Sequence, residues 1–445
     1  MKLKACLLAA VALCLAGPQA AFAETLEDAL ALAYQSNPTI RAERARLRAT
    51  EELKAQAWAN ALPQIQADGS YSHLKDTQNF NPLVVDTGGQ AVTSELNPLT
   101  AGVSAQQPLF TGFRNLNAIR QARARARAGG ARLAAVEQDV LQRVATAYFD
   151  VVRDMANYDS NLNNVDVLVR QKAEAELRFE VGEVTKTDVA QADARLAQSR
   201  AQLAASQAQL AISRAVYAEL VGNAPGTLDA SSPLPELPES LDTALALAND
   251  YSPTVIAARE QEDAAKKQVS IAKGAFLPSI SATAQYQYAD QPSSFVDRDE
   301  TFSYGVRASV PIFLGGLNLS RVREARALHD SAIESVSEAE RTAERTTTAA
   351  YQQLIAARQT IESAKTQVSA NELALTGVRR EAQLGTRTTL DVLDAEQEFL
   401  NAKVSLSNAE RNERVAAFAL LAAVGVLNPD ALGIDASRLI PEGED

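Results

Sequence analysis

Apolar positions along this chain follow two different periods, and the change between them marks the predicted elements. From Leu26 to about Asn60 they recur every three or four residues, which predicts a helix. Leu62-Pro63 ends this helix because proline disfavours helical backbone in the residue before it. Residues Gln64 to Tyr71 then alternate polar with apolar or small side chains, which predicts a strand, and Thr100 to Gln107 alternate more weakly. Together they form a predicted strand pair, 64–107.

The same order of elements returns in the second half of the chain. TLEDALALAYQSNPTI at Thr25 reappears as SLDTALALANDYSPTV at Ser240, at a spacing of 215. VGEVTKTDVAQA at Val181 reappears as LGTRTTLDVLDA at Leu384, at a spacing of 203. The second copy is therefore shorter by 12 residues, all of them lost near the loop between the paired strands. We expect two structural repeats, residues 24–222 and 240–428, related by internal pseudo-symmetry.

The strands of the second copy give the clearest alternation. Residues 279–288 alternate over ten positions without a fault, and residues 301–310 do the same, so 279–310 is the second predicted strand pair. Strands of about ten residues, with one apolar face and tyrosines near the loop ends, are what a transmembrane β-barrel requires. A soluble β-sandwich would show the same alternation. The strands alone leave both interpretations open.

Very long helices favour the membrane interpretation. Residues 113–181 contain no proline and predict a rod of about 100 Å at ~1.5 Å per residue. A tight turn leads to a second helix over 186–221, and the second copy repeats this hairpin as helices 316–384 and 389–424. Their narrow apolar stripes are typical of coiled coils. Gly129-Gly130 interrupts the first long helix and predicts a local kink.

The remaining segments connect or precede these repeats. Residues 1–23 have the basic start, apolar run and A-x-A site of a secretory signal peptide. Both cysteines, Cys6 and Cys14, lie within it, so we expect no disulfide and no thiol chemistry in the mature chain. Leu13 precedes Cys14, where a lipoprotein signal needs a small residue, so no lipid anchor is expected. The proline-rich segment 223–239 is predicted to be an extended linker, and 429–445 a similar C-terminal tail.

Charge and composition exclude several classes of function. Without Lys2 and Lys4 the chain has 41 basic and 55 acidic residues, a net charge of −14, which argues against nucleic acid as a partner. His73 and His329 are far apart and have no cysteine beside them, so we expect no metal site and no cofactor. No Ser-His-Asp or nucleotide motif indicates an enzyme. After the signal, no apolar run is long enough for a membrane helix, so a membrane would be crossed by strands.

Four strands per chain cannot close a barrel, because the smallest membrane barrels have about eight. Geometry alone permits two chains with eight strands or three chains with twelve. The two repeats, the strand pairs before QPLF and VPIF, and the turn LGTRTTLDVLDAEQEFLNAK resemble the TolC family of outer-membrane efflux and secretion channels over about residues 24–430. The resemblance implies an α+β membrane protein: a homotrimer whose 12-stranded transmembrane β-barrel continues into a 12-helix periplasmic α-barrel. The linker and tail would form a belt around its middle.

The resemblance also implies a function and partners. The protein would be the passive exit duct of a tripartite export system, in the outer membrane of a Gram-negative bacterium and extending into the periplasm. Its partners would be outer-membrane lipid, a periplasmic adaptor (membrane fusion) protein and an inner-membrane ABC or RND-type transporter. The turn GTRTTLDVLDA and the missing lipid-anchor signal favour type I protein secretion, with small-molecule efflux as the alternative. A non-channel periplasmic coiled-coil scaffold is a more distant alternative, which the amphipathic strand pairs argue against.

Both hairpin turns contain the same three helix-end residues at the same spacing. A glycine ends the long helix, a threonine follows three residues later, and an aspartate lies three beyond it. They are Gly182, Thr185 and Asp188 in the first copy and Gly385, Thr388 and Asp391 in the second. Helix capping alone is a sufficient explanation for both aspartates.

A functional interpretation starts from Asp391 and Asp394, which share one helix face. Threefold symmetry would gather six carboxylates in a ring at the periplasmic entrance, where the family has its constriction. A plain solvated face is the alternative for Asp394. Arg387 and Asp188 match an Arg–Asp latch that helps to hold the family's entrance shut, although Ala382 stands where the family's type member has a tyrosine. The resemblance places adaptor docking at the tips, Val181, Gly182 and Glu183 and Leu384, Gly385 and Thr386.

Overall fold

A computed structural model describes residues 24–78, 91–293 and 295–429 of the chain. The expected signal peptide with both cysteines, and all but the first residue of the expected tail, lie outside these ranges. The chain forms two compact units. Unit 1 contains the residues up to Arg44, Arg132–Val255 and the residues from Ala339 onward, and unit 2 contains Ala45–Ala131 and Ile256–Glu338.

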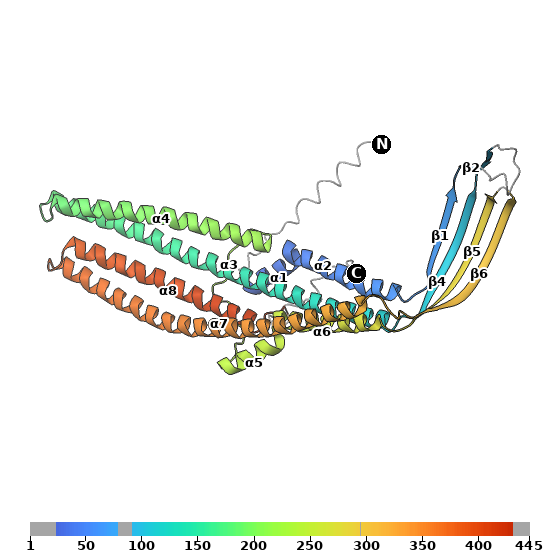
Figure 1. Ribbon diagram of the computed structural model, residues 1–445. Coiled ribbons are helices and arrows are strands. Elements are labelled where there is room, and N and C mark those ends of the chain that lie inside the picture. The colour runs from blue at the N-terminus through green and yellow to red at the C-terminus, as the bar shows by residue number, and fades with distance from the viewer. Residues whose placement is uncertain (1–23, 79–90, 294, 430–445) are drawn as a thin grey trace, which may run out of the picture. The chain divides into compact units, whose positions relative to one another are not determined.

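Unit 2 contains an antiparallel sheet of four strands in the order β1-β4-β5-β6, which lie side by side in Figure 1. The strands are β1 (Gln64–Tyr71), β4 (Leu99–Phe110), β5 (Ser279–Ser293) and β6 (Val296–Ser309). The sequence predicted only these four. Two short strands in the longer connection of the first copy, β2 (Leu74–Gln78) and β3 (Val92–Leu96), pair antiparallel as a second sheet.

The register of the four-stranded sheet sorts its side chains onto two different faces. Gln66 lies opposite Ser104, Ser104 opposite Gln285, and Gln285 opposite Ser303, so one row of polar side chains crosses all four strands. The next row, Ala67, Val103, Tyr286 and Phe302, lies on the other face and is apolar. Successive residues of a strand point to opposite faces, so the alternation in the sequence becomes one polar and one apolar surface.

The helix predicted from Leu26 to Asn60 is wrong as a single element. The structure has α1 (Leu26–Ser36) and α2 (Pro38–Ala59), with Asn37 in extended backbone between them. Proline restricts Asn37 just as Pro63 restricts Leu62, and the Asn37 side chain donates to the carbonyl of Leu220 at 3.0 Å. The second copy breaks in the same way, into α5 (Leu241–Tyr251) and α6 (Pro253–Gly274).

The two long helices each contain 67 residues, α3 (Arg114–Glu180) and α7 (Leu317–Gln383). Each turns back into a shorter helix, α4 (Lys186–Val221) or α8 (Thr389–Ala423). Helix α3 continues without a break through Gly129-Gly130. A Cβ on Gly129 would lie 3.1 Å from Leu47 Cδ1, so close packing against α2 accounts for this glycine. Among the described helices none is long and apolar enough to cross a membrane.

The core of unit 1 forms where the helices meet the linker. Tyr148 and Tyr217 are fully buried there. The hydroxyl of Tyr148 donates to the carbonyls of Glu24 and Asp229, at 2.9 and 2.8 Å. The hydroxyl of Tyr217 donates to the Glu24 carboxylate at 2.6 Å. These bonds join the start of the described chain to the 223–239 segment, and they satisfy polar groups that burial would otherwise leave unpaired.

Candidate functional site

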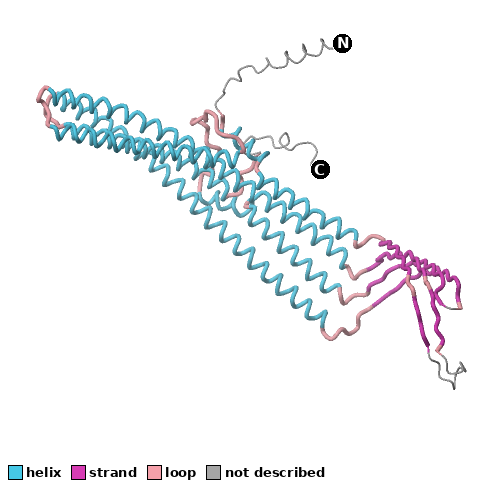
Figure 2. The backbone as a smooth tube through the Cα atoms, turned by 90° about the horizontal axis from the view of Figure 1, so that it is seen from above, coloured by secondary structure: helices cyan, strands magenta, loops and turns pink. Residues whose placement is uncertain are grey.

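The two hairpin turns of unit 1 lie at one end of the helices, where Figure 2 shows them as short loops. In the first, Gly182 has φ +80°, and the amide of Glu183 donates to the carbonyl of Arg178 at 2.9 Å. In the second, Gly385 has φ +79°, and the amide of Thr386 donates to the carbonyl of Glu381 at 3.0 Å. This is the Schellman end of a helix, which needs a left-handed residue and therefore favours glycine.

Each turn is followed by a complete capping box. The hydroxyl and amide of Thr185 donate to the Asp188 carboxylate at 2.7 and 2.8 Å, and those of Thr388 donate to Asp391 at 2.8 and 2.9 Å. The hydroxyl of Thr185 lowers the pKa of the Asp188 carboxyl, and the backbone amide of Thr388 lowers that of Asp391. The capping role that the spacing predicts is therefore formed at both aspartates. An entrance role remains a prediction.

Asp394 has a partner that the sequence did not suggest. Arg195, on α4, donates from Nη2 to Asp394 Oδ1 at 2.6 Å. The side chains are 32% and 53% exposed, so the pair lies at the surface where the two hairpins face each other. Arg195 and Asp394 are 199 residues apart, and the helical spacing of a single segment does not indicate such a pair.

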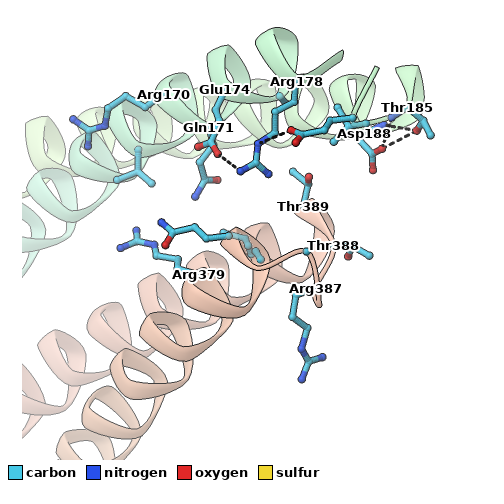
Figure 3. Close-up of a pocket in the computed structure, with 18 residues that line it drawn as sticks. Arg170, Gln171, Glu174, Arg178, Thr185, Asp188, Arg379, Arg387, Thr388 and Thr389 are labelled. Atoms are coloured by element: carbon cyan, nitrogen blue, oxygen red, sulfur yellow. Dashed lines mark hydrogen bonds and ion pairs between the residues drawn. The ribbon is translucent and has the colours of Figure 1, made fainter. Parts of the chain in front are cut away.

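The predicted latch residues lie on opposite hairpins, and the described chain contains no ion pair between them. Arg387 Nε instead donates to Glu381 Oε2 at 2.9 Å, and this bond raises the pKa of the Arg387 guanidinium. Figure 3 shows the Arg387 side chain directed away from Asp188. Within one chain each predicted latch residue therefore has another partner, and the latch remains a prediction.

A cavity of about 700 Å³ lies between the two hairpin ends and contains both latch residues in its wall. Its wall also carries Arg178, which pairs with Glu174 at 2.9 Å, and Thr185 of the first capping box. Ala382, at the position of the family's tyrosine, contributes only a methyl group. Between the two hairpin ends there is therefore a cavity whose wall combines charged and apolar side chains.

Deeper between the hairpins lies a buried carboxylate that the sequence analysis missed. Glu396, on α8, is 6% exposed. It accepts from Arg379 of α7, whose Nε lies at 2.9 Å, and from Gln171 Nε2 of α3 at 3.1 Å. Its counterpart at the repeat spacing is Asp193, an exposed residue paired with Lys172 at 2.6 Å. The internal repeat therefore did not indicate that Glu396 is buried, because the two copies differ in burial at this position.

The predicted docking tips are exposed. Val181 is 77% and Leu384 is 80% exposed, each next to the left-handed glycine of its turn. Glu183 lies 3.7 Å from the Arg178 guanidinium, and Thr386 Oγ1 donates to the carbonyl of Glu381 at 2.9 Å. Two apolar side chains thus project from tightly hydrogen-bonded turns. Docking of an adaptor at these tips remains a prediction.

No group of acidic, histidine or cysteine residues that could hold a metal occurs in the described ranges.

The sequence matches the profile of a family described as "Outer membrane efflux protein" over residues 29–223 and 244–426. The outer membrane efflux protein BepC of Brucella suis is 33% identical, over 95% of this chain and 90% of BepC. The outer membrane protein TolC of Vibrio cholerae is 25% identical, over 94% of both chains. The alkaline protease secretion protein AprF of Pseudomonas aeruginosa is 26% identical, over 94% of this chain and 88% of AprF.

The solved structure of the outer membrane protein VceC from Vibrio cholerae has the same fold. The two superpose with a TM-score of 0.75, over 90% of this chain and 96% of VceC, at 23% sequence identity. The regions that match the family profile, 29–223 and 244–426, contain both hairpin turns and all four strands of the main sheet.

Proposed function

Because the chain belongs to the outer membrane efflux protein family, we propose that three copies of it form the exit duct of a tripartite export system. The protein is an outer-membrane channel protein of the TolC type, with an α+β fold, and it extends into the periplasm. In the proposed assembly it conducts substrate passively, from an inner-membrane transporter and a periplasmic adaptor to the exterior.

The two-faced sheet is the observation that carries this proposal. Its apolar face suits lipid and its polar face suits a water-filled lumen. A sheet of four strands leaves two edges open, and lipid cannot satisfy their backbone groups. Three copies would give twelve strands, and a ring of twelve encloses a lumen wider than the side-chain-filled interior of an eight-stranded barrel.

At the periplasmic end, we propose that Asp391 and Asp394 face the axis of the trimer. The ring is weaker than six free carboxylates would be, since Arg195 partly neutralises each Asp394. The latch would form if Arg387 exchanged Glu381 for Asp188 of a neighbouring hairpin. Both of its ion pairs would be exposed and worth about 0–1 kcal/mol, so the exchange is energetically cheap.

The adaptor would dock on the exposed tips at Val181 and Leu384. We propose that the substrates are proteins secreted by a type I system. The LGTRTTLDVLDA turn and the similarity to a protease secretion protein support this proposal. Small-molecule efflux is the second candidate, because BepC is described as an efflux protein. A deletion strain distinguishes them: loss of secreted proteins at unchanged drug sensitivity supports secretion, and the reverse result supports efflux.

Conductance tests the duct itself. Purified protein in a planar bilayer should give single channels that a trivalent cation blocks from the periplasmic side. Block should weaken in Asp391→Ala/Asp394→Ala and persist in the control Glu362→Ala, which removes an exposed carboxylate of α7 far from the hairpin turn. Channels insensitive to the cation in all three proteins would reject the ring, and an absence of channels would reject the duct.

A further inference from the structure

The main sheet leaves its two outer strands, β1 and β6, without a neighbour on one side within the described chain. In the antiparallel order β1-β4-β5-β6 these two edges run in opposite directions. The open edge of β6 can therefore pair antiparallel with the open edge of β1 from a second copy. This inference rests on the proposed trimer and asks which residues meet where two copies join.

Away from the loop end of the sheet, where Asp297 and Asp299 lie on the polar face of β6, each edge strand carries one charge on that face. On β1 it is Asp68, between uncharged residues on the same face. On β6 it is Arg307, and the polar-face positions from Thr301 to Ser309 carry no other charge. Within the described ranges neither side chain has a hydrogen-bond or ion-pair partner. Two unpaired charges of opposite sign thus lie on the two edges that must meet.

We propose that β6 of one copy pairs with β1 of the next in the register that places Arg307 opposite Asp68, forming one ion pair at each subunit boundary. On the apolar face the same register places Tyr304 opposite Tyr71. These two tyrosines are 81% and 72% exposed in the single chain. Both a charge pair and an aromatic pair stabilise neighbouring strands when they lie directly opposite each other.

The tilt of the strands is compatible with this register and excludes one of its two neighbours. Gln64, Gln106, Thr283 and Gly305 form one row across the sheet. In the proposed register Gly305 meets Ser70 of the next copy, six residues beyond Gln64. Each of the three subunit boundaries therefore displaces the row by six residues, which gives a stagger of about 18 residues around a ring of twelve strands. With a rise of ~3.3 Å and a strand spacing of ~4.8 Å, that stagger tilts the strands by about 46°.

Registers displaced by two residues fit less well. Moving one way gives a tilt of about 54°, well above the roughly 35–45° of membrane barrels, whereas about 46° lies at the upper limit of that range. Moving the other way gives about 35°, which the fold permits, but it leaves Asp68 opposite Gly305 and Arg307 opposite Gln66. A shift by one residue would turn polar side chains toward lipid. Charge complementarity therefore decides between the two permitted tilts.

Backbone hydrogen bonding indicates how close the two side chains come. The amide of Ser72 donates to the carbonyl of Pro98 at 3.1 Å, so the even-numbered residues of β1 bond toward β4. Odd-numbered residues, such as Ala67 and Gly69, direct their backbone groups to the open edge. Asp68 then occupies a non-hydrogen-bonded position of the new pair, where opposite Cα atoms are about 4.5 Å apart and side chains are closest.

Cysteine cross-linking tests the register in the intact protein. The mature chain is expected to contain no cysteine, since Cys6 and Cys14 lie in the predicted signal peptide. Under mild oxidation, Asp68→Cys/Arg307→Cys should convert most chains to covalent dimers and trimers on denaturing gels. The matched controls Asp68→Cys/Gly305→Cys and Asp68→Cys/Ser309→Cys represent the registers displaced by two residues, and they should cross-link far less.

The outcomes separate the register from the duct. Stronger cross-linking in either control would overturn the register, and so would an absence of cross-links in all three proteins that still conduct in bilayers. Cross-linked trimers that never conduct would keep the register and reject the duct. In uncross-linked protein, Asp68→Arg should lower the temperature at which trimers dissociate, and Asp68→Arg/Arg307→Asp should restore it. A failure of the double exchange to restore it would also overturn the ion pair.

Discussion

Arg195 of α4 and Asp394 of α8 form an ion pair of 2.6 Å that joins the two helical hairpins of one chain. Asp394 is the aspartate without a capping role, and the sequence therefore favoured it for an open carboxylate ring. The structure gives that carboxylate a cation of its own. If the ring exists, Arg195 controls how much of its charge a passing ion experiences.

Replacing Arg195 with Gln should therefore strengthen block by cations. Two unit charges ~4 Å apart in water interact by about 1 kcal/mol, and a trivalent blocker by up to three times as much, so its affinity should rise at least roughly fivefold per freed Asp394. The measurement is the blocking constant in single-channel recordings. Arg200→Gln is the control, since Arg200 is an exposed arginine about one and a half turns further along α4 and therefore on another face of that helix. Equal block in the two variants would place Asp394 away from the ion path.

Replacing Glu396 with Ala should loosen the contact between the hairpins. It removes the acceptor for Arg379 and Gln171 at a buried position, which costs about 1–3 kcal/mol. Hydrogen–deuterium exchange should become faster in residues 165–180 and 376–383. The control is Asp193→Ala at the equivalent position of the first copy, where an exposed pair contributes only ~0–1 kcal/mol. Equal protection in both variants would show that Glu396 does not hold the hairpins together.

The hairpin tips should remain ordered in mild acid. The pKa values of Asp188 and Asp391 in the folded protein lie below their ordinary 3.8. A lowered folded pKa stabilises the fold fully above 3.8, and this stabilisation is lost as pH falls through the folded value. Amide protection at the starts of α4 and α8 should thus be constant from neutral pH down to about 4 and fall below it. Asp391→Asn should remove this dependence at α8 and keep it at α4.

The sequence predicted those elements whose cause is local. The Leu62-Pro63 boundary, the left-handed glycines and both capping boxes depend on residues at most six apart, and the structure forms all of them. The break at Asn37 follows from the same proline rule but was missed, because the apolar period continues across it. The spacing of apolar residues identifies the buried face of a helix. One residue in extended backbone, such as Asn37, does not change that spacing, so the spacing does not show where the helix breaks.

Contacts between helices could not be predicted in this way. Arg195 with Asp394, and Gln171 with Glu396, join residues about 200 positions apart. Periodicity predicts which side of a helix is buried, but not which residue of another helix lies opposite. The internal repeat did not help, since the exposed Asp193 is the counterpart of the buried Glu396. Contacts between the edge strands of the sheet are easier to predict than contacts between helices. Only a few registers of β6 with β1 are possible, and the charge pairs in each of them can be compared.

The paired glycines of α3 should respond differently to alanine. Nothing lies within 4 Å of a Cβ built on Gly130, so Gly130→Ala should stabilise the helix by about 1 kcal/mol, the difference in helix propensity. At Gly129 the new methyl would meet Leu47 Cδ1 at 3.1 Å, so displacement of Leu47 should offset most of that gain. The midpoint of thermal unfolding, followed by helical circular dichroism, should rise for Gly130→Ala and change little for Gly129→Ala. An equal rise in both would mean that α2 does not need the glycine, and the kink that the sequence suggested would again be the better explanation for it.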